Sequence, residues 1–114
     1  MNIMSDAEQV KQLKIKTGVV KRLVKEHISY QKQVVKDEEK AAKLAADATN
    51  EDEEYVAKKA KEVARETVTM VRDAQGRLQK AVADLQNLIA SGNFSESAEL
   101  SEAKTQLEAA TASA

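Results

Sequence analysis

In two long segments of this chain, most residues reached by steps of three and four are apolar, and no proline interrupts either segment. The two segments cover roughly residues 7–48 and 52–90, and a shorter segment with the same spacing covers roughly 95–111. Such spacing gathers the apolar side chains into one stripe along an α-helix, as in coiled coils. Sandwich and barrel folds need many turns, and a chain without proline and with three glycines cannot supply them. We therefore predict an all-α fold, an elongated antiparallel three-helix bundle of coiled-coil type with two long helices and a shorter third, forming a single domain over residues 1–114.

Two short stretches mark the expected helix boundaries. Asn50 is a good N-cap, and Glu53 lies three residues later, where its side chain can complete a capping box. Further along, Gly92 is placed to adopt the left-handed conformation that ends many helices. Asn93 or Ser95 is then expected to cap the third helix.

The apolar stripes also predict the core. His27 falls on the first stripe and is expected to be a partly buried core residue. The large aliphatic residues that should line the core are Leu13, Val20, Leu23, Val34, Leu44, Val71, Leu78, Leu85, Leu88, Leu100 and Leu107.

The residues needed for catalysis or metal binding are scarce. There is no cysteine and one histidine, so thiolate sites, paired-histidine metal sites and a serine–histidine–aspartate triad with a spare base are excluded. The three glycines are far apart and form no phosphate-binding loop. We expect no enzymatic activity, no metal and no cofactor. No apolar run exceeds three residues and no signal peptide is visible, so we expect a cytoplasmic protein with no membrane span.

Charge is unevenly distributed along the chain. Residues 11–36 hold eight basic residues and one acid, whereas residues 37–54 hold eight acids and two basic residues, and the formal net charge of the whole chain is −1. A net charge near zero, with only one aromatic residue, Tyr30, among the basic ones, argues against a nucleic-acid partner. The charged runs are either solvated helix faces or a docking surface for a partner of opposite charge.

Residues 12–26, QLKIKTGVVKRLVKE, followed by Tyr30 and Lys32, resemble the N-terminal helix of the tubulin binding cofactor A family. The resemblance implies a cytosolic three-helix chaperone that captures quasi-native β-tubulin after its release from the chaperonin. Such a protein passes the subunit on toward assembly with α-tubulin, through the other tubulin-folding cofactors, without hydrolysing a nucleotide. It would be a monomer or weak dimer, located in the cytoplasm or at the microtubule cytoskeleton.

Because β-tubulin is acidic, the basic band of the first helix is the expected steering surface, with the second helix around residues 58–72 as the other candidate. Val24 lies beside the band in the sequence and is expected to add apolar contact at its rim. The candidate partner-binding residues are Lys14, Lys21, Arg22, Val24, Lys25, Lys58, Lys59, Arg65 and Arg72.

Two other functional classes remain open from the sequence. The alanine-, lysine- and glutamate-rich stretch over residues 58–80 also suits an amphipathic protectant or membrane-surface helix, which would be disordered alone in buffer. The basic stretch over residues 11–36 would equally suit a helical adaptor for a different acidic partner. A cooperative, strongly helical thermal melt would favour the bundle over the protectant.

Overall fold

The computed structural model describes residues 5–113, and within that range the chain forms three α-helices and no β-strand. They are α1 (Asp6–Asp47), α2 (Glu51–Ser91) and α3 (Ala98–Ser113). The predicted all-α class, with two long helices and a shorter third, is confirmed. By its packing, the chain divides into two compact units. Unit 1 comprises Met1–Lys25 and Gln75–Ala114, and unit 2 comprises Glu26–Ala74.

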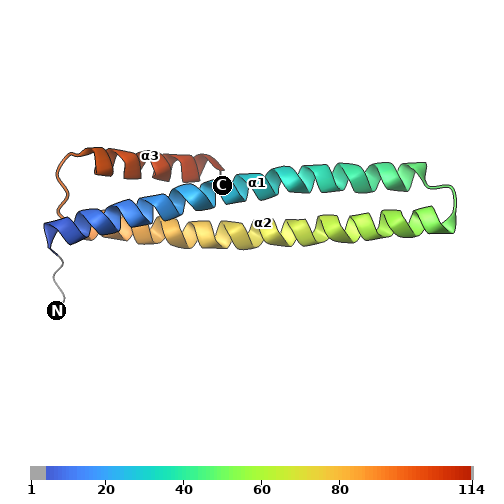
Figure 1. Ribbon diagram of the computed structural model, residues 1–114, viewed down its shortest axis with the longest axis horizontal. Coiled ribbons are helices and arrows are strands. Elements are labelled where there is room, and N and C mark those ends of the chain that lie inside the picture. The colour runs from blue at the N-terminus through green and yellow to red at the C-terminus, as the bar shows by residue number, and fades with distance from the viewer. Residues whose placement is uncertain (1–4, 114) are drawn as a thin grey trace. The chain divides into compact units, whose positions relative to one another are not determined.

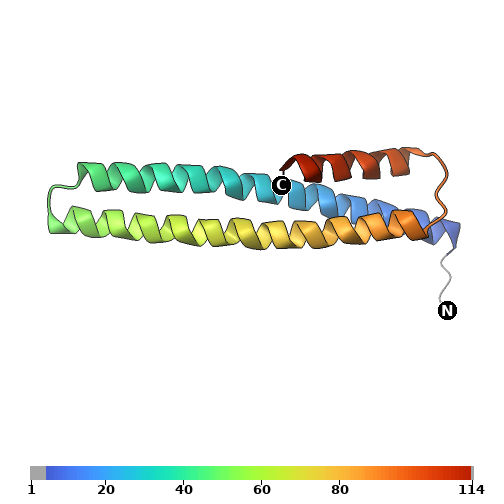
Figure 2. The same ribbon diagram turned by 180° about the vertical axis from the view of Figure 1, so that it is seen from behind.

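Each unit has a simple arrangement of helices. In unit 1, α3 lies alongside the first part of α1, and the views from front and back agree on this placement (Figures 1 and 2). In unit 2, the second part of α1 and the first part of α2 lie side by side and run antiparallel (Figure 1). The loop between these helices spans only residues 48–50, and a loop this short makes consecutive helices antiparallel neighbours.

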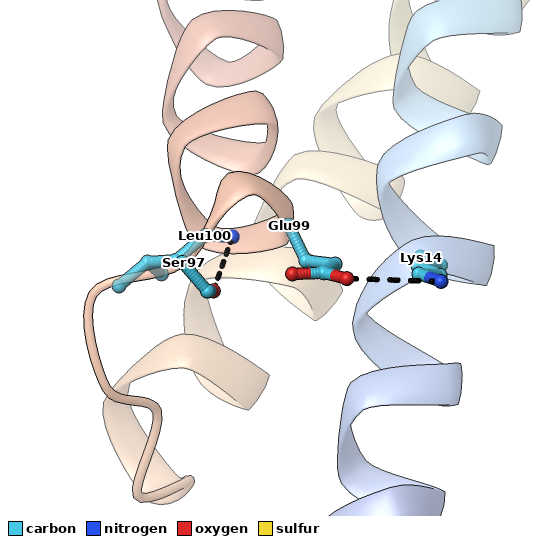
Figure 3. Close-up of polar contacts among 4 residues, drawn as sticks. All are labelled: Lys14, Ser97, Glu99 and Leu100. Atoms are coloured by element: carbon cyan, nitrogen blue, oxygen red, sulfur yellow. Dashed lines mark hydrogen bonds and ion pairs between the residues drawn. The ribbon is translucent and has the colours of Figure 1, made fainter.

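Each helix begins at a side chain that caps its free backbone N–H groups. The Asn50 side chain accepts a hydrogen bond from the Glu53 backbone N–H at 2.9 Å, which confirms the predicted cap of α2. For α3, the prediction of Asn93 or Ser95 was wrong, because Ser97 Oγ accepts from the Leu100 backbone N–H at 3.2 Å (Figure 3). Consequently α3 starts at Ala98, later than the expected residue 95.

The left-handed conformation predicted for Gly92 is wrong. None of the described glycines has a positive φ, so Gly92 does not end α2 through a left-handed conformation. A Cβ atom at this position would instead lie 2.3 Å from the Phe94 ring. Phe94 therefore folds back over the end of α2, and a larger residue at position 92 would require the Phe94 ring to move.

The core of unit 1 is built from leucine and valine of the two long helices and alanine of α3. Leu13, Val20 and Leu85 have no exposed surface. On α3, Ala103 and Ala110 are buried. Of the eleven aliphatic residues expected in the core, the buried ones are Leu13, Val20, Leu23, Leu78 and Leu85. The half-buried ones are Val34, Leu44, Val71, Leu88, Leu100 and Leu107.

Buried alanines and a hydrogen-bonded pair of side chains hold the two helices of unit 2 together. Only two helical segments belong to this unit, so its larger aliphatic side chains are either half-buried, as Leu44 is, or exposed, as Val35 and Val63 are. The fully buried apolar residues of the unit are alanines. The buried Thr67 hydroxyl on α2 donates a hydrogen bond to Asp37 Oδ2 on α1 at 2.6 Å. The Gln33 side-chain amide donates to Asp37 Oδ1 at 2.8 Å. Asp37 therefore joins the two helices of unit 2.

Replacing Thr67 with valine should make the stability of the protein less sensitive to acid. The Thr67 hydroxyl, then Gln33, and the nearby Lys40 charge hold the pKa of Asp37 below its ordinary value of 3.8. A lowered native pKa gives stability that is present above pH ~4 and is lost as the pH falls through the native pKa. Thr67→Val removes the largest of these effects, so the free energy of unfolding should fall less steeply on acidification below pH ~4.

Urea unfolding across an acidic pH series measures this effect. Thr69→Val is the matched control, because the exposed Thr69 hydroxyl on the same helix contacts the Arg65 carbonyl and not Asp37. If the free energy of unfolding depends on pH in the same way for Thr67→Val and the wild-type protein, the hydrogen bond does not favour ionised Asp37.

Candidate functional site

The described chain offers charged surfaces and grooves to a partner. Within residues 5–113, no group of three or more histidine, aspartate and glutamate side chains could hold a metal ion. In the same range, no helix is long and apolar enough to cross a membrane. The candidate features lie on α1 in unit 1 and on the two helices of unit 2.

The first feature is the basic face of α1, which we define as Lys14, Lys21, Arg22 and Lys25 in unit 1. All four residues are exposed. Spacings of four and seven place Lys14, Lys21 and Lys25 on one side of the helix, as predicted for Lys21 and Lys25, and Arg22 borders that side. Lys21, Arg22 and Lys25 form no ion pair with another described residue, so their charges are free to meet a partner.

Lys14 differs from the other three because it faces α3. Its Nζ lies 3.7 Å from Glu99 Oε1 near the start of α3, as Figure 3 shows. The Lys14 side chain remains 64% exposed, so this ion pair contributes only about 0–1 kcal/mol to stability. The contact leaves the Lys14 charge partly compensated.

Val24 is not part of this exposed surface. The residue was expected at its rim, but it is 6% exposed and belongs to the core of unit 1. Because α1 packs against both α2 and α3 in this unit, its buried stripe is wider than a seam between two helices. Val24 falls inside that wider stripe and cannot contact a partner while the unit is folded.

The second feature is on α2 in unit 2. Lys58, Arg65 and Arg72 are exposed and recur every seven residues, so they share one side of the helix. Lys59 lies on another side and is engaged locally. Its Nζ is 3.4 Å from Glu62 Oε2 and 5.3 Å from the centre of the Tyr55 ring. The structure therefore groups three of the four predicted α2 residues and separates the fourth.

Beside this row is a groove of about 700 Å³ between the α1 and α2 segments of unit 2. Its wall includes Lys58 and Arg65 together with Lys61, which was not among the predicted partner-binding residues. Alanines from both helices form most of the remaining lining. The sequence signal for the groove was the run of alanines on both apolar stripes, because alanine leaves space where larger residues would fill it.

The amino-acid sequence of this chain is similar to that of a known protein family. The family described as tubulin binding cofactor A matches residues 8–107 of this chain. Tubulin-specific chaperone A of Oryctolagus cuniculus is 45% identical over 91 residues, which are 80% of this chain and 82% of that protein. Tubulin-folding cofactor A of Arabidopsis thaliana is 40% identical over 81 residues, which are 71% of this chain and 69% of that protein.

Two solved structures resemble the fold. The crystal structure of tubulin folding cofactor A from Arabidopsis thaliana aligns with a TM-score of 0.84 at 30% identity, covering 93% of this chain and 98% of that one. Human tubulin chaperone cofactor A aligns with a TM-score of 0.74 at 39% identity, covering 90% of this chain and 98% of that one. Sequence and fold agree with the resemblance seen in residues 12–26, and the chain belongs to the tubulin binding cofactor A family.

Proposed function

We propose that this protein is a non-catalytic tubulin-folding chaperone that captures quasi-native β-tubulin and passes it on during assembly of the tubulin heterodimer. The observation that carries the proposal is the family match over residues 8–107. It is supported by relatives whose names describe a tubulin-specific chaperone and a tubulin-folding cofactor. The partner would be the β-tubulin subunit, and the other tubulin-folding cofactors would receive it.

The chemistry of capture needs no reacting group. A tubulin subunit without its partner exposes apolar surface that the heterodimer later covers, and such surface leads to aggregation. A helical protein can shield this surface by binding alone. The free cations on the basic face of α1 suit an acidic client, because opposite charges accelerate and orient the encounter.

Capture can be tested with purified components. The wild-type chain is added to β-tubulin subunits that would otherwise aggregate, and light scattering and gel filtration follow the outcome. We expect a soluble complex with β-tubulin, formed without added nucleotide, and no comparable complex with α-tubulin. Persistent aggregation of β-tubulin, with no complex on the column, would reject the proposed function.

Reversing two charges on the basic face should slow capture without unfolding the protein. Lys21→Glu combined with Lys25→Glu is expected to lower the association rate with β-tubulin severalfold at low salt. The difference should shrink as salt rises, because screening shortens the reach of each charge. The thermal melt should be nearly unchanged, since both residues are exposed.

Stopped-flow association rates across a salt series provide the measurement. Lys80→Glu with Lys104→Glu is the matched control, because it changes the net charge equally at exposed residues of α2 and α3. Equal association rates for the Lys21/Lys25 variant and the wild type at low salt would show that the contact lies elsewhere.

A further inference from the structure

The groove in unit 2 has a floor of small side chains. It lies between the α1 and α2 segments of this unit and has a volume of about 700 Å³. Ala41, Ala57 and Ala64 are buried, whereas Ala42 and Ala45 are exposed at its α1 edge. Because an alanine side chain ends at Cβ, a helix laid on such a floor can approach closely along its length. The shape therefore suits an elongated helical segment with a narrow face of small residues.

The wall of the groove on α2 is cationic. Lys58, Lys61 and Arg65 line it over two helical turns, and none of them forms an ion pair with another described residue. Glu54 lies one turn before Lys58, and Glu38 lines the groove from α1. A segment in the groove would therefore be matched in charge if it turned carboxylates toward the three cations.

Unit 1 contains an acidic helix that packs on the long helices through small buried residues and an ion pair. Helix α3 has three glutamates and one lysine, and it buries Ala103 and Ala110. Its edge carries Glu99, which lies 3.7 Å from Lys14 of α1 (Figure 3). The chain itself thus shows that an acidic helix with small buried residues packs on its long helices.

Resting on the proposed function, we propose that the unit 2 groove seats an acidic amphipathic helix of the captured tubulin subunit. The narrow small-residue face of that helix lies on the alanine floor, and its carboxylates face Lys58, Lys61 and Arg65. This contact holds the client after encounter, whereas the basic face of α1 acts on the encounter rate. Loss of the groove contact should accordingly appear in the dissociation rate.

Filling the groove tests its shape. Ala45→Trp places a large ring at its exposed edge and leaves the buried alanines unchanged. Ala46→Trp is the control, because the next residue is also exposed but does not line the groove. We expect Ala45→Trp to raise the dissociation rate of the β-tubulin complex roughly tenfold or more. The control should stay close to the wild type.

Reversing the charges on the wall tests whether the groove recognises its occupant by charge. The variant leaves the alanine floor unchanged. Lys58→Glu with Lys61→Glu should also raise the dissociation rate roughly tenfold. Lys36→Glu with Lys43→Glu makes the same change in net charge at exposed residues of the same unit that do not line the groove. This control should leave the dissociation rate nearly unchanged. If circular dichroism shows that Ala45→Trp is unfolded, the wall variant decides the question.

The outcomes separate this inference from the proposed function. Absence of β-tubulin capture by the wild type rejects the proposed function and the inference together. Normal wild-type capture with unchanged dissociation in the groove variants rejects the inference alone. Sedimentation of the free protein measures its oligomeric state and tests a second copy of the chain as the occupant of the groove. If Ala45→Trp dissociates a wild-type dimer while leaving β-tubulin dissociation unchanged, the groove seats a second copy of the chain, and the inference is overturned.

Discussion

Replacing Leu13 with alanine is expected to lower the free energy of unfolding by about 2–5 kcal/mol. Leu13 has no exposed surface in the core of unit 1. Its truncation removes apolar contacts and leaves a cavity that the neighbouring helices can only partly close. Because a small protein is stabilised by only about 5–15 kcal/mol, the expected loss is a large share of the total.

Ile15→Ala is the matched control, since it lies two residues away on α1 and is 48% exposed. Its effect should stay within about 0.5 kcal/mol. Urea unfolding followed by circular dichroism gives both values, and a single transition is expected if residues 1–114 form one cooperative domain. Equal losses for the two variants would mean that the buried stripe of α1 has a different register. A wild-type protein without helical signal in buffer would instead favour the protectant hypothesis.

Placing a carboxylate at Ala103 is expected to detach α3. Ala103 has no exposed surface, and burying an unpaired charge there costs several kcal/mol. The other contacts of α3 are weaker, because Ala110 is its only other buried residue among those described, Leu100 and Leu107 are half-buried, and the ion pair with Lys14 is exposed. Releasing the helix therefore costs less than keeping the charge buried, so Ala103→Asp should unfold α3 while most of the helical signal remains.

Hydrogen exchange is the appropriate measurement because it reports on each helix separately. The amides of residues 98–113 should lose protection in Ala103→Asp, and those of unit 2 should retain it. Thr105→Asp is the control, since it adds the same charge at an exposed position of the same helix. If α3 stays protected in Ala103→Asp, the helix is held by contacts stronger than the burial of Ala110 and the ion pair with Lys14.

The sequence predicted the helices well because the signals for them are local. Spacings of three and four, together with the Asn50 cap, involve residues within one or two turns of each other. The start of α3 was harder to predict, because Asn93, Ser95 and Ser97 are all suitable caps close together. The conformation of Gly92 was predicted wrongly, because a glycine near a helix end can adopt either sign of φ and the pattern of residue types does not decide between them.

The candidate site was predictable only in part, since exposure depends on how many neighbours a helix has. Most of the cations on α1 and α2 that form no ion pair, such as Lys21, Lys25 and Arg65, could be found from charge alone. The burial of Val24 could not, because it results from α3 packing beside α1 in unit 1. Lys61 and the groove were also missed, since a groove arises where two alanine stripes from different helices meet.

The division into units has a consequence for the order in which the chain can fold during synthesis. Unit 2 is one continuous stretch, Glu26–Ala74, closed by a loop of a few residues, so the entropy lost in bringing its halves together is small. Residues 5–25, in contrast, have their packing partners in the part of the chain that follows residue 74. The N-terminal part of α1 therefore leaves the ribosome before its packing partners in the last third of the chain have been synthesised. Its basic face acquires its native surroundings only when translation is nearly complete.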